Sequence, residues 1–307
     1  MAEAVQTNLP TAATRPPLRQ RAGLRRINWN LLGLIPFFLF VIAFQLFPSV
    51  AIIVRSFLND AGKLTLDNIT GLNQPIIMNA YLSSVKISLI SAVWGGILGF
   101  GLAWAVTIGG LPNWVRTAVL SFCGVAANFA GIPLAFAFIA TIGQTGILTK
   151  LLGTMGLKLY PSFTLYGFWG ICLVYTYFQI PLMVLVLAPA LDGLRREWRE
   201  AAENLGASRF EYWRHVALPI LLPSILGALT LLFANAFGAQ ATAFALVGGG
   251  AGQNLVVTVM VGAQFSTDSF ANPGLGNALA LGMMVIIGVS IFVYSWMRRR
   301  AERWQSR

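Results

Sequence analysis

Long apolar runs dominate this sequence and limit what it can fold into. Six stretches of about twenty or more residues carry almost no charge, and the polar residues come in blocks between them. The core of a soluble protein cannot bury segments of this length, whereas a helix of about twenty apolar residues crosses roughly 30 Å of hydrocarbon. The pattern predicts an all-α integral membrane protein with about six transmembrane helices, at residues 31–55, 83–108, 115–141, 164–190, 221–246 and 273–297.

A further apolar segment, residues 255–265, is too short to span a membrane. We expect it to be an interfacial or re-entrant piece on the outer side, between the fifth and sixth spans. Within the second span, the run WGGILGFG contains Gly95, Gly99 and Gly101. Small residues of this kind let transmembrane helices approach closely, so we expect these glycines to serve helix packing.

The distribution of basic residues predicts the orientation in the membrane. Of the seventeen arginines, all but Arg55 lie in four places, at residues 15–26, 116, 195–214 and 298–307. Pairs of spans separate these places, so they can share one side, which is the cytoplasmic side by the positive-inside rule. Both termini are therefore predicted to be cytoplasmic and the protein to lie in the inner (plasma) membrane. The formal charge of +11 is explained by this bias, and we expect no nucleic-acid partner because the basic residues are not interleaved with aromatics on one face.

The chain is expected to consist of one membrane domain with two polar ends. Residues 1–28 contain TRPPLRQR, which cannot hold a helix, and are predicted to be a disordered basic cytoplasmic arm. Residues 29–299 form the predicted six-span domain, and residues 300–307 a basic cytoplasmic tail. The first apolar run is too long for a signal peptide and has no cleavage site at its end, so we expect no cleaved leader. The two cysteines, Cys123 and Cys172, fall inside spans without metal-ligand spacing, so no metal site is predicted.

The most charged internal segment lies between the fourth and fifth spans, at residues 192–220, and we call it the elbow. Gly206 can turn left-handed at the end of a first short helix, and Ser208 with Glu211 has the spacing of a capping box that begins a second one. Pro219 is expected to limit how far the second helix continues. Apolar residues recur on one stripe of the first helix, at Leu194, Trp198, Ala201, Ala202 and Leu205. Such a ridge fits a groove on another protein, and the alternative is an amphipathic helix lying on lipid headgroups.

The order of residues in the elbow favours the protein partner. Glu200-Ala201-Ala202, three residues, Gly206, nine residues, and then Val216-Ala217-Leu218-Pro219 resembles the EAA signature of permease subunits of binding-protein-dependent ABC importers. The one departure is Val216, where the family pattern has isoleucine. The six-span layout resembles the same family over about residues 30–300. GQTGILTKLL and ATAFALVGGG look like the subgroup that serves polyamines, phosphonates, sulfate, ferric iron and related solutes.

The resemblance implies a set of partners and a docking site. Two copies of a separate ATP-binding subunit, a second permease that is identical or homologous, and an extracytoplasmic solute-binding protein are expected, with the lipid bilayer around them. ATP would be bound by the ATPase partner, and no cofactor by this chain. The residues expected to dock the ATPase are those that match the signature: Glu200, Ala201, Ala202, Gly206, Val216, Leu218 and Pro219.

The chain is not expected to be an enzyme. It contains no G-x-x-x-x-G-K-[ST] motif, and VGGGAGQN at residues 247–254 lacks the lysine that such a site needs. The only histidine, His215, stands beside Arg214 without a catalytic arrangement of partners, so a surface or docking role is expected.

An ion-coupled secondary transporter or channel is the alternative function. Such proteins usually carry ionisable residues at membrane depth, and here every Asp and Glu falls outside the predicted spans while Lys86 lies near the outer end of one. A translocation pathway still needs polar lining. Asn235 and Gln240 are about 140° apart on a single helix, so they are not expected to face the same narrow line. The candidates for this lining are Asn128, Gln179, Asn235 and Gln240, with interhelical hydrogen bonding as the alternative role of each.

Overall fold

The structure is a computed structural model that describes residues 34–59, 61–247, 256–265 and 272–305. The basic arm predicted at residues 1–28 lies outside the described residues. The chain divides into two units, residues 1–50 and 51–307. Apart from one isolated antiparallel bridge between Leu58 and Leu64, the regular elements of the described residues are all helices, so the predicted all-α class is confirmed.

Six of the described helical segments are long and apolar enough to cross a membrane, which confirms the predicted number of spans. In order, they are Ile35–Arg55, Pro75–Thr107, Ile132–Thr154, Phe168–Asp192, Arg209–Gly238 and Pro273–Arg299. The predicted ranges agree with five of these within about a dozen residues at each end, and the third differs in kind.

The first candidate span consists of α1 (Ile35–Val41), a π-helical turn η2 (Ile42–Leu46) and α2 (Phe47–Arg55). The part of this segment that belongs to the unit of residues 1–50 exposes large apolar side chains, among them Phe37, Phe40 and Phe44. A helix that is apolar on all sides is stable in lipid or in a protein core rather than in water. The Phe47 N–H donates to the Ile42 carbonyl, five residues back, so the wide turn comes directly before Pro48.

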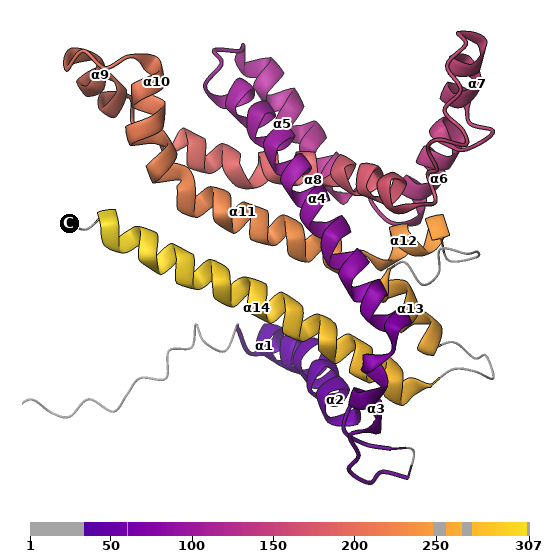
Figure 1. The fold of residues 1–307 in the computed structure, drawn as a ribbon. Coiled ribbons are helices and arrows are strands. Elements are labelled where there is room, and N and C mark those ends of the chain that lie inside the picture. Colours follow the sequence, from indigo (N-terminus) through magenta and orange to yellow (C-terminus); the bar gives the residue numbers. More distant parts are fainter. Residues whose placement is uncertain (1–33, 60, 248–255, 266–271, 306–307) are drawn as a thin grey trace, which may run out of the picture. The chain divides into compact units, whose positions relative to one another are not determined.

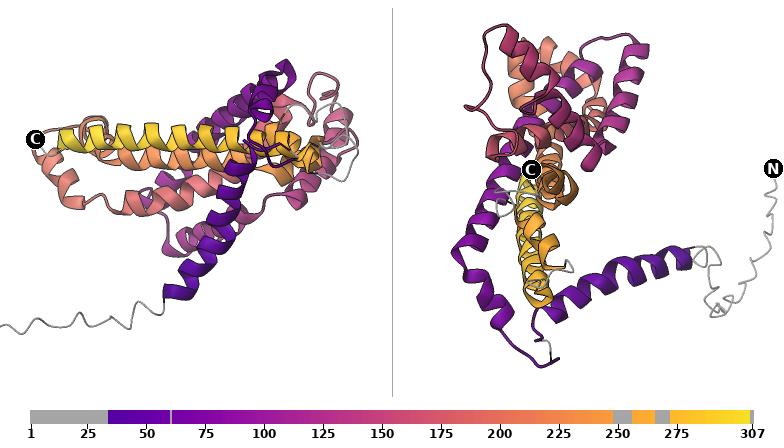
Figure 2. Two further views of the ribbon diagram at one scale, coloured as in Figure 1. Left: turned by 90° about the horizontal axis from the view of Figure 1, so that it is seen from below. Right: turned by 90° about the vertical axis from the view of Figure 1, so that its right-hand side faces the viewer.

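In residues 51–307 the long helices form a bundle (Figure 1). Its members are α4 (Pro75–Thr107), α5 (Asn113–Asn128), α8 (Phe168–Asp192), α11 (Leu218–Gly238) and α14 (Pro273–Gln305). The most extensive contact joins α4 to α8, and α11 packs on both of them. α14 runs beside α11, as the views in Figure 2 also show. Two short helical segments, α3 (Asp67–Thr70) and η3 (Gly71–Asn73), precede α4.

Two glycines explain how closely α4 and α8 approach. A Cβ atom on Gly99 would stand 2.5 Å from the Met183 Cβ and 2.7 Å from the Ile180 carbonyl oxygen, and one on Gly95 would overlap Gln179. The packing role predicted for these two glycines is therefore confirmed. The same prediction was wrong for Gly101, because nothing lies within 4 Å of its Cβ position.

The single helix predicted at residues 115–141 is wrong. The structure has α5 up to Asn128, a break at Phe129 to Gly131, and then α6 (Ile132–Ile142), followed by α7 (Ile147–Thr154). Gly131 has φ 74° and ψ −148°, a backbone conformation open in practice only to glycine. Pro133 occupies the first turn of α6, where a missing N–H breaks no helical hydrogen bond.

The helix predicted at residues 221–246 is also interrupted. α11 ends at Gly238, Ala239 leaves the helical conformation, and α12 (Gln240–Val247) follows. The Tyr175 hydroxyl of α8 donates to the Ala239 carbonyl over 2.6 Å, and the Gly131 N–H donates to the Thr242 Oγ1 over 2.8 Å. The Tyr175 bond thus ties the second break to α8, and the Gly131 bond ties the first break to α12. Each satisfies a backbone polar atom that lipid could not.

The short apolar segment after the fifth span is helical, as α13 (Val257–Gln264), and is too short to cross a membrane. Residue 255, where the predicted segment began, lies outside the described residues. The Val257 N–H donates to the Ser84 Oγ of α4 over 2.8 Å, and Val257 is fully buried. α13 is therefore attached to the bundle, packing against α14, α12 and α4.

Candidate functional site: the elbow between the fourth and fifth spans

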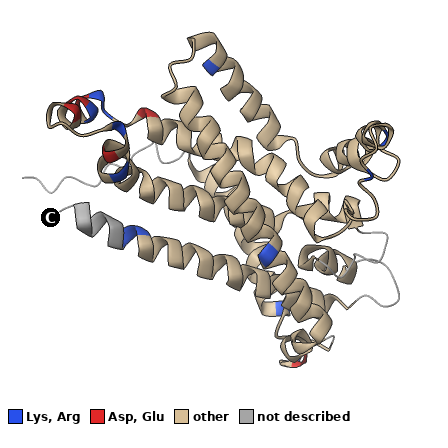
Figure 3. Ribbon diagram, turned by 45° about the horizontal axis from the view of Figure 1, so that its top comes forward, with Lys and Arg blue, Asp and Glu red and all other residues tan. Residues whose placement is uncertain are grey.

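The elbow is formed by α9 (Arg196–Asn204) and α10 (Arg209–Tyr212), which leads through a π-helical turn η4 (Trp213–Ala217) into α11. Charged residues gather on this elbow, whereas the long helices are almost free of them (Figure 3). Two ion pairs run along α9, with Arg196 Nε 3.1 Å from Glu200 Oε1 and Arg199 Nε 2.8 Å from Glu203 Oε1. Hydrogen bonding to Glu203 raises the pKa of Arg199 further above its usual range.

Gly206 ends α9 as the sequence predicted. It has φ 82°, and its N–H donates to the Glu203 carbonyl while the Ala207 N–H donates to the Ala202 carbonyl, each over 3.0 Å. This pair of bonds is the Schellman motif, which satisfies carbonyls that the helix end leaves free. No neighbouring atom lies within 4 Å of the Gly206 Cβ position, so the backbone conformation alone selects glycine here.

The predicted capping box is also confirmed. The Ser208 N–H donates to Glu211 Oε2 over 2.7 Å, and the Glu211 N–H donates to Ser208 Oγ over 3.3 Å. Together with the Schellman motif, these bonds define the chain direction on both sides of Gly206 through contacts between residues close in sequence. The angle between α9 and α10 is therefore locally specified.

The expectation that Pro219 limits the second helix was wrong. α10, η4 and α11 form one helical segment from Arg209 to Gly238. The Leu218 N–H donates to the Trp213 carbonyl, five residues back, so the helix is wider just before the proline. A proline ring clashes with the carbonyl four residues before it in a regular α-helix, and a π-helical turn changes that register.

The predicted apolar ridge on α9 is only partly available. Leu194 packs against the bundle core around Leu187 and Leu191 and belongs to the membrane domain. Trp198 is 37% exposed, with the Arg195 guanidinium 5.8 Å from its ring centroid. By contrast Leu205 is 88% exposed and Phe210 is 72% exposed. Two large apolar side chains, one on either side of Gly206 in the sequence, therefore lie in solvent. Phe210 was not predicted, although its place two residues after the cap residue Ser208 can be read from the sequence.

The remaining signature residues lie on the same segment. Glu200 and Ala201 are exposed, Ala202 is half-buried, and Val216 on η4 is half-buried as well. Leu218 and Pro219 are exposed at the start of α11. His215 is exposed, with its Nδ1 3.1 Å from the Glu211 carbonyl oxygen. The structure brings these residues together on the elbow and at its junction with α11.

The four polar residues expected to line a pathway fall into two groups. Gln179 is fully buried, and its Nε2 donates to the Leu232 carbonyl of α11 over 2.7 Å, which is the interhelical hydrogen bond considered as its alternative role. Asn128, Asn235 and Gln240 are exposed. The expectation that Asn235 and Gln240 point apart on one helix does not apply, because the helix is broken at Ala239 between them.

Six apolar helical segments that are long enough to cross a membrane, with charge concentrated on a capped loop between two of them, define a multi-pass membrane protein. Residues 97–306 match the family described as the binding-protein-dependent transport system inner membrane component. Because the match covers more than half of the chain, the protein belongs to this family, the permease subunits of binding-protein-dependent ABC importers. Membership implies an ATPase and a solute-binding protein as partners.

Named relatives agree with this assignment. The chain is 26% identical over 266 residues to the spermidine/putrescine transport system permease protein PotB of Escherichia coli strain K12, covering 85% of this chain and 94% of that protein. It is 27% identical over 201 residues to a probable sulfate transport system permease protein, cysT, of Prototheca wickerhamii, covering 65% of this chain and 72% of that protein. Both relatives are named as permeases.

Solved structures share the fold. A chain of a bacterial ABC transporter involved in the import of the acidic polysaccharide alginate superposes with a TM-score of 0.70 at 17% identity, covering 89% of this chain and 96% of that one. A chain of the MetNI methionine ABC transporter, in an inward-facing conformation, gives a TM-score of 0.55 at 17% identity, covering 74% and 96%.

Proposed function

We propose that this permease forms one half of the translocation pathway of an importer for a small polar solute, and that ATP hydrolysis in a separate subunit drives it through the elbow. The observation that carries the proposal is the elbow itself. Its two short helices are capped on both sides of Gly206, and the exposed side chains of Leu205 and Phe210 stand beside that turn. A rigid projection with exposed apolar residues fits a groove on a protein partner better than it fits water.

The proposed docking surface comprises the signature residues, namely Glu200, Ala201, Ala202, Gly206, Val216, Leu218 and Pro219. Because α10 continues into α11 without interruption, a displacement of the elbow is transmitted along one helix into the membrane domain. ATP-driven closure of two ATPase subunits would push two elbows together, one from this chain and one from a second permease. The pathway would then open outward to accept solute from the binding protein.

The proposed pathway lining is Asn128, Asn235 and Gln240. Gln179 ranks after them because its side chain is buried. These carboxamides are exposed at the ends of α5, α11 and the start of α12, and neutral amides can both donate to and accept from a polar solute. Polyamines are the first solute class to test, because relatives named for spermidine and putrescine match 85% of the chain; phosphonates and similar small polar solutes come next. The proposal includes both termini in the cytoplasm, and the excess of arginine on the elbow side of the sequence supports this orientation.

The docking proposal is tested by affinity purification of the tagged chain in mild detergent, expressed with its neighbouring genes, followed by an ATP hydrolysis assay. Leu205→Asp and Phe210→Asp place a charge on the exposed docking face, and we expect them to abolish co-purification of the ATPase. Leu64→Asp is the matched control, since Leu64 is 86% exposed but lies between α2 and α3. Retention of the ATPase by both elbow variants would contradict docking and favour the alternative, in which the elbow lies on lipid headgroups.

A further inference from the structure

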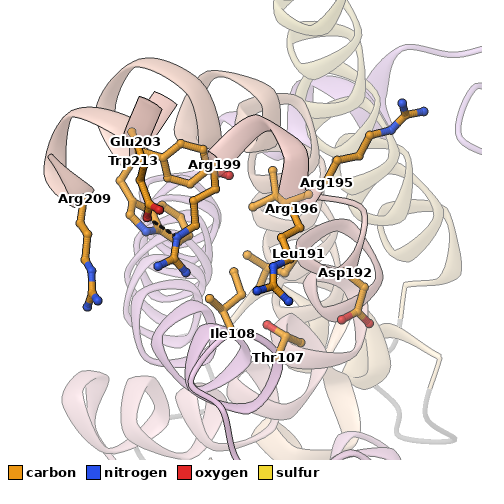
Figure 4. A pocket seen from close by; sticks show the side chains of 12 residues that line it. Thr107, Ile108, Leu191, Asp192, Arg195, Arg196, Arg199, Glu203, Arg209 and Trp213 are labelled. Atoms are coloured by element: carbon orange, nitrogen blue, oxygen red, sulfur yellow. Dashed lines mark hydrogen bonds and ion pairs between the residues drawn. The ribbon is translucent and has the colours of Figure 1, made fainter. Parts of the chain in front are cut away.

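A basic pocket of about 450 Å³ lies between the elbow and the ends of two membrane helices (Figure 4). Its volume falls within the range of about 300–1,000 Å³ typical of small-molecule sites. α4 ends at its floor with Thr107 and Ile108, and the α9 residues Arg196 and Arg199 extend toward that end. The lining residues are Thr107, Ile108, Leu191, Asp192, Leu194, Arg195, Arg196, Arg199, Glu203, Arg209, Tyr212 and Trp213.

The charge of this pocket is positive. Four arginines line it, against the two carboxylates Asp192 and Glu203. Both carboxylates already have a cationic partner, because Asp192 pairs with Arg116 from outside the pocket and Glu203 pairs with Arg199. Arg196 and Arg199 each use Nε in their pairs with Glu200 and Glu203. Their terminal N–H groups, with the guanidinium groups of Arg195 and Arg209, favour an anion with several acceptor oxygens, and a phosphate group has the matching geometry.

An apolar groove of about 270 Å³ lies between α4, α8 and α11. It is lined by Val93, Gly96, Ile97, Phe100, Met183, Leu218, Ile225 and Leu229. On α4, positions 93, 97, 100, 104 and 107 recur every three or four residues and therefore share one face of the helix. The groove and the basic pocket thus lie on the same face of α4, and at about 1.5 Å per residue Phe100 and Thr107 are about 10 Å apart along its axis.

Two tryptophans stand between the groove and the pocket. The ring centroids of Trp104 on α4 and Trp213 on η4 are 6.4 Å apart, in an edge-to-face arrangement, and Trp213 itself lines the pocket. Tryptophan is enriched at the level of the lipid headgroups, where its ring meets apolar chains and its N–H meets polar groups. The order along α4 is therefore apolar groove, aromatic pair and cationic pocket, which is the order of an acyl chain, a glycerol region and a phosphate.

We propose that this face binds one anionic phospholipid of the inner leaflet, with its phosphate among Arg196, Arg199 and Arg209 and one acyl chain in the groove lined by Ile97 and Phe100. Basic pockets between membrane helices on the cytoplasmic side bind such headgroups. The lipid links the elbow to α4, so its loss loosens the elbow. Of the signature residues, Leu218 lines the groove and Glu200 pairs with the pocket residue Arg196; the others are not among the residues that line the pocket or the groove.

The test uses the complete transporter, purified with its partners, delipidated in detergent and then given phosphatidylglycerol or phosphatidylcholine. Bound lipid is counted by native mass spectrometry, and the thermal midpoint is recorded. Arg199→Gln with Arg209→Gln leaves two arginines against two carboxylates, and we expect it to weaken phosphatidylglycerol binding by about 25-fold, roughly a factor of five for each cation. Arg214→Gln, an exposed arginine outside the pocket, is the control and should bind normally.

A second variant tests the acyl chain without touching the elbow. Ile97→Phe fills the groove, and we expect it to lower phosphatidylglycerol binding as well, whereas Leu98→Phe, which is exposed on another side of α4, should not. Equal binding of the two lipids, or unchanged binding in the double arginine variant, would overturn the proposal. Unchanged phosphatidylglycerol binding in Ile97→Phe would show that no acyl chain occupies the groove, and equal stabilisation by inorganic phosphate alone would assign the pocket to a free phosphate. Either outcome would overturn the proposed lipid site.

Discussion

The Arg116 guanidinium donates from Nη2 to Asp192 Oδ2 and joins the first turn of α5 to the last residue of α8. The two side chains are 36% and 42% exposed. Arg116 lies just after the loop between α4 and α5, and Asp192 lies at the end of the helix that leads into the elbow. The pair therefore holds together the end of the bundle on which the elbow stands. The pair also balances the negative charge of Asp192, which lines the basic pocket, so the arginines of the pocket outnumber its remaining carboxylate.

Breaking this pair should have a small effect on stability. We expect Arg116→Ala and Asp192→Ala each to lower the free energy of unfolding by no more than about 1 kcal/mol, because partly exposed pairs are screened by solvent. The exchanged pair, Arg116→Asp with Asp192→Arg, should recover most of the loss. Thermal midpoints of the purified complex measure both effects, and a double exchange no more stable than the single variants would show that the pair does not act as a pair.

Gly206 should tolerate only residues that accept a left-handed backbone. We expect Gly206→Val to cost about 1–2 kcal/mol at the turn and to abolish transport while the chain still inserts, since no neighbouring atom would meet the new side chain. Gly206→Asn is the matched control, because asparagine is the next most frequent residue at this helix-end position. Uptake by membrane vesicles, with the amount of inserted chain measured in parallel, checks this; normal uptake in Gly206→Val would contradict it.

Substitution of Gly99 should force α4 away from α8. The valine in Gly99→Val would place its Cβ against Met183 and the Ile180 carbonyl, and since a backbone atom cannot rotate away, we expect a loss of about 1–3 kcal/mol or more. Gly101→Val, two residues along the same helix, meets nothing within 4 Å and should be close to neutral. The measurement is the thermal midpoint and the yield of folded protein, and equal effects of the two variants would refute the close-packing role.

Gln179 should act in stability rather than in solute contact. We expect Gln179→Met, which keeps the length of the side chain but removes the hydrogen bond to Leu232, to cost about 0.6–2 kcal/mol. Asn235→Leu, at an exposed carboxamide on α11, should leave the thermal midpoint near that of the unmodified protein. If Gln179→Met left the midpoint unchanged while Asn235→Leu lowered it, the buried hydrogen bond would not be the contact that joins α8 to α11 at this level.

Much of this arrangement could be predicted from the sequence because it depends on neighbours in the chain. The number of spans follows from the length of the apolar runs, and the elbow follows from Gly206, Ser208 and Glu211, whose hydrogen bonds close within a few residues. Hydrophobic length and local capping are interactions that a short window of sequence contains in full. The resemblance of residues 200–219 to the family signature was confirmed by the match over residues 97–306.

Contacts between distant segments were decided only by the tertiary structure. An apolar run such as residues 115–141 has no hydrophobic period that marks its interruption, and the break at Gly131 is satisfied by Thr242, a residue more than a hundred positions away. The same is true of Gln179, whose burial depends on α4 and α11, and of the arginine pocket, which needs the ends of α4 and α8 beside the elbow. The sequence by itself determined which segments enter the membrane and how the elbow turns, since water excludes apolar side chains and caps act locally; which polar groups face each other depended on how the helices pack.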